Sequence, residues 1–149
     1  MALQPGESPG FLLWHATLRW QRAVTRALAP LDLTHVQFVL LACAWWAGRE
    51  GGEPPNQLAL AGQAGTDVKM TSAVLGTLER KGLIRRETDP GDTRAKRVAV
   101  TARGAELAPR AIEAVEQADA EFFREVPTGD ALSLLRRLAK EYPSKGVQE

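Results

Sequence analysis

The sequence contains few of the residues that most often build metal and redox sites. It has one cysteine, Cys43, and two histidines, His15 and His35, among 149 residues. A single cysteine excludes an internal disulfide and any cysteine-based metal centre, and two imidazoles make a structural zinc site improbable. The sequence also lacks a glycine-rich phosphate loop and a catalytic constellation. We therefore expect no metal, no cofactor and no enzymatic activity.

Long apolar runs are absent as well. No run approaches the ~20 residues that a membrane-spanning helix requires. The first ten residues, MALQPGESPG, have no basic region followed by an apolar core, unlike a secretory signal. We expect a cytoplasmic protein with no membrane partner. With 44% hydrophobic and 25% charged residues, the chain predicts one folded domain, which we place at 9–142.

The net charge of +1 conceals a marked asymmetry along the chain. Basic residues dominate from Glu79 to Arg103, whereas acidic residues dominate from Glu106 to Glu125. This pattern predicts a basic face for an anionic partner and an acidic surface that points elsewhere.

Two helix starts stand out in the first third of the chain. Ser8 followed by Pro9 is a good N-cap, and it predicts a helix over 9–28 that stops before Pro30. Thr34 and Gln37 form a capping box before a helix from Val36 to about Ala47. The apolar residues of the first helix occupy more than one stripe, so we expect burial on two sides, one of them against a second subunit.

Residues 56–82 predict a helix-turn-helix. Asn56 is positioned to cap a short helix to about Gln63, Gly65 makes the turn, and either Thr66 or Asp67 caps a fourth helix. That helix ends at Gly82, with Leu78 and Leu83 as the apolar pair of a Schellman motif.

A basic hairpin and two further helices follow. We expect strands over 83–88 and 96–100, joined by a protruding connection over 89–95. Thr101 is positioned to cap a long fifth helix, and 127–129 separates it from a sixth. The fold class is therefore mainly α with a small β-hairpin (α+β), and the tail after Pro143 is expected to fray.

The fourth helix has two contrasting faces at ~100° per residue. The predicted core face comprises Val68, Met70, Thr71, Val74, Leu75 and Leu78. The opposite face carries small residues with cations towards its ends, which would let the backbone sink into a DNA major groove ~12 Å wide. The residues of this face and its flanks are Thr66, Lys69, Ser72, Ala73, Gly76, Thr77 and Arg80. The alternative interpretation is a merely solvated helix face.

The hairpin strengthens the DNA interpretation. Arg94 lies near its tip and suits a narrow minor groove, where the negative potential is enhanced. Asp92, two residues earlier, is positioned to orient the guanidinium, while Lys96 and Arg97 are better placed for phosphates.

These segments resemble the MarR family of bacterial winged helix-turn-helix regulators. The resemblance rests on LTHVQFVLLACA, on the run from Leu58 to Gly104 with its DxRA hairpin, and on Thr-x-x-Gly at the next helix start. It implies a winged helix-turn-helix over 33–101, flanked by dimerisation helices over 9–30 and 102–142. It further implies a homodimeric repressor with Arg94 as the minor-groove arginine. Met70-Thr71-Ser72 departs from the commoner Thr-Val-Thr-like run of the family, so the operator sequence is not implied.

Family members often release DNA when a small aromatic or phenolic anion binds between the dimerisation and DNA-binding regions. Aromatic walls with a cation would suit such an effector. The candidate pocket residues are Trp14, His15, Arg19, Trp45, Trp46 and Arg86. The alternative is that the tryptophans pack the interface and the core.

Two other functions remain open at this point. Cys43 invites a redox-switch hypothesis, but its apolar surroundings should raise its pKa and make it unreactive. A winged-helix module for protein–protein interaction, without specific DNA binding, is the main alternative to the DNA-binding regulator.

Overall fold

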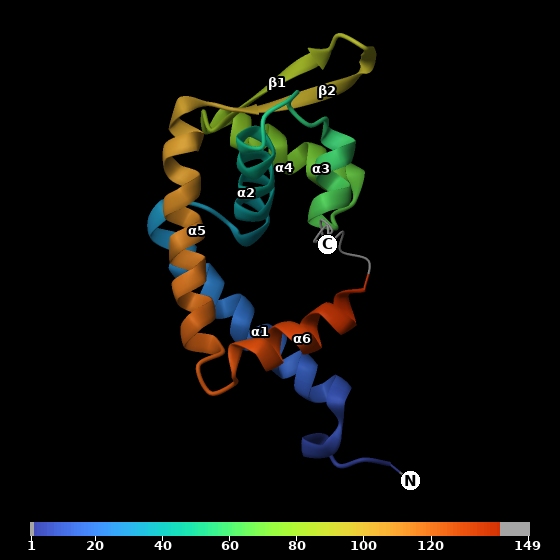
Figure 1. Cartoon of the computed structure of the whole chain (residues 1–149), viewed down its shortest axis with the longest axis vertical. Helices are drawn as coiled ribbons and strands as arrows, with labels where there is room; N and C mark the ends of the chain where they lie inside the picture. The colour runs from blue at the N-terminus through green and yellow to red at the C-terminus, as the bar shows by residue number, and fades with distance from the viewer. Residues whose placement is uncertain (1, 141–149) are drawn as a thin grey trace, which may run out of the picture.

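Six α-helices, two short 3₁₀ helices and one antiparallel hairpin make up the computed structural model, which describes residues 2–140 (Figure 1). The predicted α+β fold class is confirmed. In chain order the elements are η1 (Pro5–Glu7), α1 (Pro9–Leu28), η2 (Ala29–Leu31), α2 (His35–Arg49), α3 (Gln57–Ala64), α4 (Val68–Arg80), β1 (Ile84–Asp89), β2 (Asp92–Val100), α5 (Ala102–Phe122) and α6 (Thr128–Ala139).

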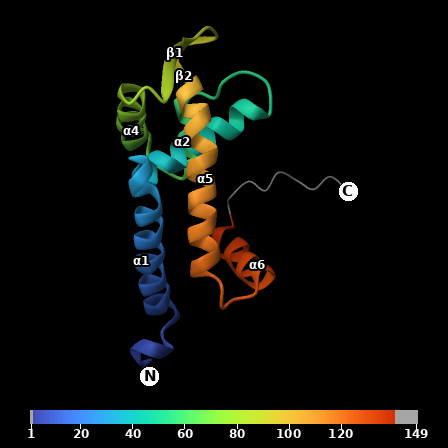
Figure 2. The same cartoon turned by 90° about the vertical axis from the view of Figure 1, so that its left-hand side faces the viewer.

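The long helix α5 connects two parts of the molecule. Helices α2, α3 and α4 and the hairpin gather around its first half, and α1 and α6 lie near its second half (Figures 1 and 2). Within the described chain no single helix is long and apolar enough to cross a membrane; only the pair Pro9–Leu31 and His35–Arg49, bent by 72°, meets that criterion together.

The predicted helix caps are present. The side chains of Ser8, Thr34, Asn56 and Thr101 each accept a hydrogen bond from a backbone N–H in the first turn of the following helix. Of the two candidates for α4, Asp67 is the cap, because its Oδ1 accepts from the Met70 N–H at 2.8 Å. Local side-chain chemistry therefore fixes where these helices begin.

The Schellman motif at the end of α4 is confirmed. Gly82 has φ of +75°, and its N–H donates to the Glu79 carbonyl at 2.9 Å while the Leu83 N–H donates to Leu78 at 3.0 Å. The Thr101 hydroxyl then donates to the Gly82 carbonyl at 2.7 Å. The end of α4 is thereby joined to the start of α5.

The predicted seven-residue hairpin connection is wrong. Strand β2 begins at Asp92, which pairs with Asp89, so the turn itself is only Pro90-Gly91. Thr88 pairs with Lys96, whereas the next residue, Asp89, pairs with Asp92. The register therefore shifts between Thr88 and Asp89, and residues 93–95 of β2 form the irregularity. Asp89 Oδ1 accepts from the Gly91 N–H at 2.9 Å and closes the turn.

The core lies where α2, α4, α5 and the hairpin base meet, and it receives the end of α1. The fully buried aliphatic side chains are Val24, Leu28, Leu40, Leu41, Leu60, Leu75, Leu78, Ile84 and Val98.

The predicted core face of α4 is only partly correct. Thr71, Leu75 and Leu78 are buried, but Val68 and Met70 are 56% and 42% exposed. The buried stripe is centred on Thr71–Leu75–Leu78, and Met70 lies a quarter-turn or more away from it at ~100° per residue.

A substitution at Gly104 tests the junction between α4 and α5. A Cβ at this position would lie 2.1 Å from the Leu83 carbonyl oxygen and 2.8 Å from Val100 Cγ1. Gly104→Ala should therefore lower the free energy of unfolding by at least about 1–3 kcal/mol, because the backbone at Leu83 must move away from the new Cβ. Gly48→Ala in α2, where nothing lies within 4 Å, is the matched control and should stabilise by up to about 1 kcal/mol. Equal urea midpoints for the two variants would contradict this packing.

His35 gives the fold a pH dependence. Its ring packs edge-on against Trp20 with centroids 5.0 Å apart, and Trp20 Nε1 donates to Asp119 Oδ1 at 2.8 Å. Burial lowers the pKa of His35, partly opposed by Asp119. The folded state therefore favours the neutral imidazole. This contribution to stability is complete above the usual histidine pKa of about 6.5 and is lost as pH falls towards the lower folded value.

We therefore expect the free energy of unfolding, measured in urea between pH 7.5 and 5.5, to fall more steeply in the parent than in His35→Gln. Gln21→Ala, on the exposed face of α1, leaves every titrating group in place; it is the control and should keep the parental slope. Parallel curves for the parent and His35→Gln would show that His35 is not responsible.

Candidate nucleic-acid interface

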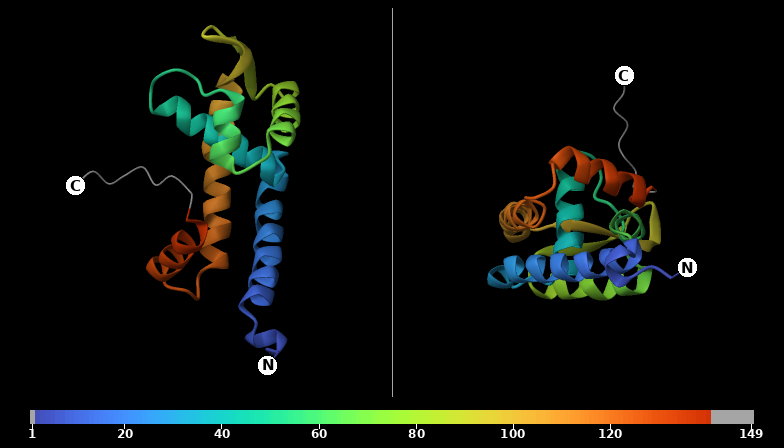
Figure 3. Two further views of the ribbon diagram at one scale, coloured as in Figure 1. Left: turned by 90° about the vertical axis from the view of Figure 1, so that its right-hand side faces the viewer. Right: turned by 90° about the horizontal axis from the view of Figure 1, so that it is seen from below.

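Helices α3 and α4 and the hairpin lie together at one end of the molecule (Figure 3). Lys69, Ala73 and Arg80 lie on the outward face of α4 and are exposed, and Thr77 beside them is half-buried. Arg80 Nη2 donates to Thr77 Oγ1 at 3.0 Å, which holds the guanidinium along the helix. This face combines one small residue with two cations, as a close approach to a polyanion requires.

Gly76 does not lie on the open surface, contrary to the prediction. It is buried, and a Cβ there would lie 3.4 Å from Arg86 Nη2 and 3.5 Å from Arg80 Nη1. Ser72 is half-buried on the same flank, and its carbonyl accepts from Arg86 Nη1 at 3.4 Å. The small residue at 76 therefore makes room for a guanidinium of the protein itself.

Arg86 connects three elements at the base of the hairpin. Its side chain is 18% exposed and pairs with Glu79 of α4 at 3.3 Å, while Nη1 donates to Gln57 Oε1 of α3 at 3.2 Å. The backbone N–H of Arg86, and secondarily its guanidinium, hold the pKa of Glu79 below its usual value. The guanidinium of Arg86 thus binds groups of the protein itself, so it is not available as the effector cation that we predicted.

The hairpin presents Arg94 to solvent. Arg94 and Lys96 are both exposed. Asp92 Oδ1 accepts from the backbone N–H of Arg94 at 3.0 Å, so Asp92 fixes the backbone of the arginine rather than its guanidinium as predicted. Arg94 is therefore an exposed cation near the start of β2, and Asp92 braces its backbone.

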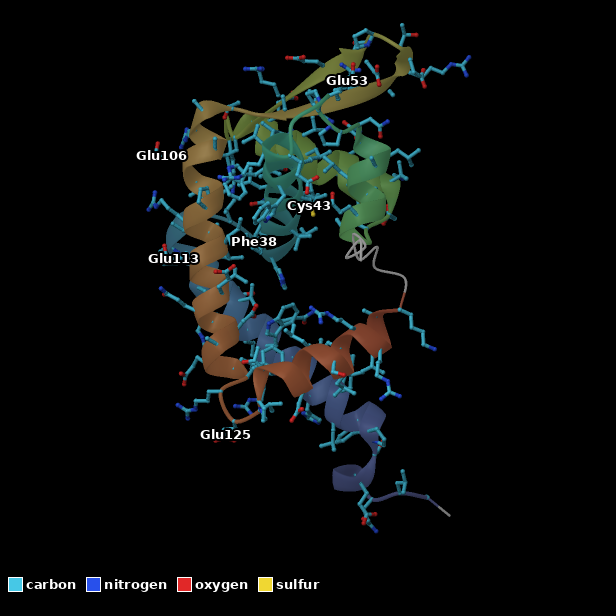
Figure 4. The ribbon with its side chains drawn as sticks, viewed as in Figure 1. Phe38, Cys43, Glu53, Glu106, Glu113 and Glu125 are labelled. Atoms are coloured by element: carbon cyan, nitrogen blue, oxygen red, sulfur yellow. The ribbon has the colours of Figure 1, made fainter. Side chains whose placement is uncertain are left out.

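Arg97 is a brace and not a free cation. Its side chain is 19% exposed, and Nη2 lies 2.6 Å from Glu53 Oε2 and 3.4 Å from Asp89 Oδ1. Glu53 comes from the loop between α2 and α3, which passes beside the hairpin (Figure 4). The predicted phosphate contact by Arg97 is therefore replaced by two ion pairs that the sequence pattern did not reveal.

Thr66 is half-buried and its hydroxyl is engaged. Thr66 Oγ1 lies 2.6 Å from Thr71 Oγ1, and Thr71 itself donates to the Asp67 carbonyl at 2.8 Å. Since Thr71 uses its proton there, Thr66 must donate to Thr71. Thr66 can thus offer a DNA donor only its lone pairs, and donating to a phosphate would require breaking this bond.

Lys81 is a functional link that the sequence analysis missed. Its Nζ donates to the backbone carbonyl of Asp32 and, at 2.9 Å, to Gln37 Oε1. Asp32 is left-handed at φ of +54° and follows η2 directly. The end of α4 is therefore attached to the turn between α1 and α2. A lysine within a basic run gave no signal of this role.

The six predicted effector residues do not form one pocket. His15 and Arg19 line a cleft of about 1000 Å³ between α1 and α5, and α2 does not contribute to it. Trp14 and Trp46 are 62% and 51% exposed, away from this cleft. Trp45 is half-buried beneath the guanidinium of Arg49, which lies 4.7 Å from its ring centroid.

Cys43 lies half-buried on α2 (Figure 4). Burial raises the pKa of its thiol, as the apolar sequence context predicted. A raised pKa disfavours the thiolate that redox chemistry requires.

Removing the side chain of Arg86 should destabilise the fold. Arg86→Ala leaves Glu79 without its cation and uncovers Gly76, so the free energy of unfolding should fall by about 1–3 kcal/mol. Arg85→Ala, whose side chain is 64% exposed, is the matched control and should change it by less than about 0.5 kcal/mol. Thermal melts of both variants provide the measurement. Indistinguishable melting temperatures would show that Arg86 does not stabilise the junction between α4, α3 and the hairpin.

Comparisons with known proteins agree with this architecture. The model of the MarR family matches residues 33–96. The uncharacterized HTH-type transcriptional regulator YdcH of Bacillus subtilis is 47% identical over 120 residues, or 80% of each chain. The crystal structure of CouR from Rhodococcus jostii RHA1 bound to p-coumaroyl-CoA has a TM-score of 0.81 at 25% identity, covering 99% of this chain and 100% of that one. A MarR-family regulator from Rhodococcus sp. RHA1 has a TM-score of 0.79 at 28% identity, covering 92% and 94%.

The exposed face of α4, the braced hairpin and these likenesses lead to one conclusion. The chain belongs to the MarR family of winged helix-turn-helix transcriptional regulators.

Proposed function

We propose that the protein is a homodimeric repressor that binds a pseudo-palindromic operator in duplex DNA. The observation that carries this proposal is the pairing of an exposed, cation-bearing face on α4 with an exposed arginine on a braced hairpin. A protein-interaction module would have no need for an exposed arginine on a braced hairpin, so this second interpretation is not favoured.

Homodimerisation is supported by apolar side chains that one copy leaves in water. On α1, Phe11 and Trp14 are 47% and 62% exposed; on α6, Leu134 and Leu138 are 58% and 61% exposed. These two helices lie on either side of the second half of α5 (Figure 2), and exposed apolar surface on both of them fits burial against a second copy. We assign dimerisation to 9–30 and 102–142, and DNA binding to 33–101. Residues 141 and 142 lie outside the described part of the chain, as does the predicted frayed tail.

The DNA contacts that we propose are fewer than the sequence indicated. Lys69, Ala73 and Arg80 would face the major groove with Thr77 beside them, and Arg94 would enter the adjacent minor groove. Lys96 would contact phosphate. A two-fold dimer would place the half-sites about one helical turn, ~34 Å, apart.

We further propose that an anionic effector relieves repression. CouR, the structural relative, binds p-coumaroyl-CoA, and this chain has a large cleft with cations on its wall. We propose that the protein binds DNA and a ligand and does not catalyse a reaction, as is typical of the family. We also propose that it acts in the cytoplasm, where its operator DNA lies.

Arg94→Ala tests the proposed docking. On a fragment from its own upstream region, the parent should show specific binding that weakens steeply with salt. Arg94→Ala should bind about tenfold or more weaker, with the largest loss where the operator has a narrow A·T-rich minor groove. Arg110→Ala on α5 removes the same charge far from the hairpin and should bind as the parent does. Mobility shifts across salt provide the measurement. If the parent shows no sequence preference, or if Arg94→Ala binds like Arg110→Ala, the docking is wrong.

A further inference from the structure

The loop between α2 and α3 runs along one edge of the hairpin. Strand β2 pairs with β1 on its other edge. On the loop side the Val98 N–H donates to the Pro55 carbonyl at 2.8 Å, and Asn56 forms an isolated antiparallel bridge with Arg97. The base of the hairpin is therefore attached to the helical part of the molecule through backbone contacts.

The backbone of this loop is stiff on both sides of Glu53. Gly51 and Gly52, with φ of +74° and +107°, adopt conformations that side chains disfavour. Pro54 and Pro55 follow Glu53, and their rings fix the backbone φ angles. The carboxylate of Glu53 therefore starts from a backbone that is already ordered.

Glu53 extends the attachment towards the tip of the hairpin (Figure 4). Its Oε2 lies 2.6 Å from Arg97 Nη2, which also lies 3.4 Å from Asp89 Oδ1. The same Asp89 oxygen accepts from the Gly91 N–H at 2.9 Å and closes the turn. Direct contacts thus run from the loop through one guanidinium to the hairpin turn, beside the strand that carries Arg94.

The two carboxylates on Arg97 have different consequences. Asp89 belongs to the hairpin, so its pair with Arg97 stiffens the hairpin without fixing its direction. Within the described residues, two ion pairs join the hairpin to the helical part. Arg86 with Glu79 lies at the base, and the pair made by Glu53 lies one residue pair nearer the tip. Without Glu53, the outer hairpin could swing about its base.

We propose that Glu53 is a positioning residue for DNA binding. Through Arg97 it fixes the direction of the outer hairpin, and so the place of Arg94 relative to α4. Its hold on the hairpin needs no DNA, whereas its effect on affinity rests on the DNA-binding function proposed above.

The charge of Glu53 makes this role separable from plain electrostatics. A carboxylate beside a DNA-binding surface repels phosphates, so its removal should by itself tighten binding. Its removal would also release Arg97 to contact phosphate. Positioning predicts the opposite sign, because a hairpin that swings must be ordered again on binding, at a cost in affinity.

DNA affinity of the full-length protein, measured by fluorescence anisotropy on its operator fragment, tests the sign. Glu53→Gln and Glu53→Ala remove the same charge, but the glutamine carbonyl can still accept from Arg97. We expect Glu53→Ala to bind at least about fivefold weaker than Glu53→Gln and about threefold weaker than the parent. Glu87→Ala is the control, because it removes a hairpin carboxylate that pairs with the exposed Arg85. It should bind as tightly as the parent or more tightly.

A double-mutant cycle distinguishes positioning from a general structural role. Glu53 is 79% exposed, and an ion pair with so exposed a partner adds little stability. Glu53→Ala should therefore melt within about 3 °C of the parent. In an Arg94→Ala background, Glu53→Ala should change DNA affinity less than about twofold, because the guanidinium that it positions is gone. An equal loss in both backgrounds, or an alanine variant that binds as tightly as Glu53→Gln, would overturn the proposal.

Hydrogen exchange of the DNA-free protein separates this proposal from the proposed function. We expect the amides of residues 89–96 to exchange faster in Glu53→Ala than in Glu53→Gln, while the Val98 amide keeps its parental rate. Faster exchange in a protein without sequence preference for DNA would remove the repressor and leave the hold of Glu53 on the hairpin. Specific DNA binding with unchanged exchange would remove only the role of Glu53.

Discussion

The position of the recognition helix depends on one guanidinium, that of Arg86. It bridges Glu79 and the Ser72 carbonyl on α4 to Gln57 at the start of α3. Because its backbone belongs to β1, the same residue also sets where the hairpin leaves the helical core. The distance between α4 and the hairpin tip, which decides whether two adjacent grooves can be read together, is therefore fixed inside the protomer.

The two ends of α4 are held just as firmly. At its start, Asp67 caps the helix and the buried hydroxyl of Thr71 binds the carbonyl of the capping residue. At its end, Lys81 reaches the turn after η2, and the Gly82 carbonyl accepts from Thr101. Among the described residues, only the outward face of α4 is left without a partner. An ordered helix with one free face loses little conformational entropy on binding, so more of the contact energy is retained as affinity.

The parts of the fold that obey local rules could be predicted from the sequence. The caps at Thr34 and Asn56 and the left-handed Gly82 each depend on residues within one helical turn. The errors concern pairings between distant segments. Gly76 is small because Arg86 covers it, and Arg97 is neutralised by Glu53 from a separate loop. A helical wheel and a charge count report which residues share a face or a segment, but not which distant side chain occupies it.

Helix α1 shows why its apolar pattern fits no single stripe. Val24 and Leu28 face the core, and Phe11 and Trp14 remain in water where a second copy would bury them. Arg19, Arg22 and Arg26 occupy a third side, along the cleft towards α5. A helix with three such faces cannot shift towards one neighbour without changing its contacts with the others. Since Lys81 binds the residue after η2, an event in the dimerisation half would be transmitted to α4 by a short chain of direct contacts.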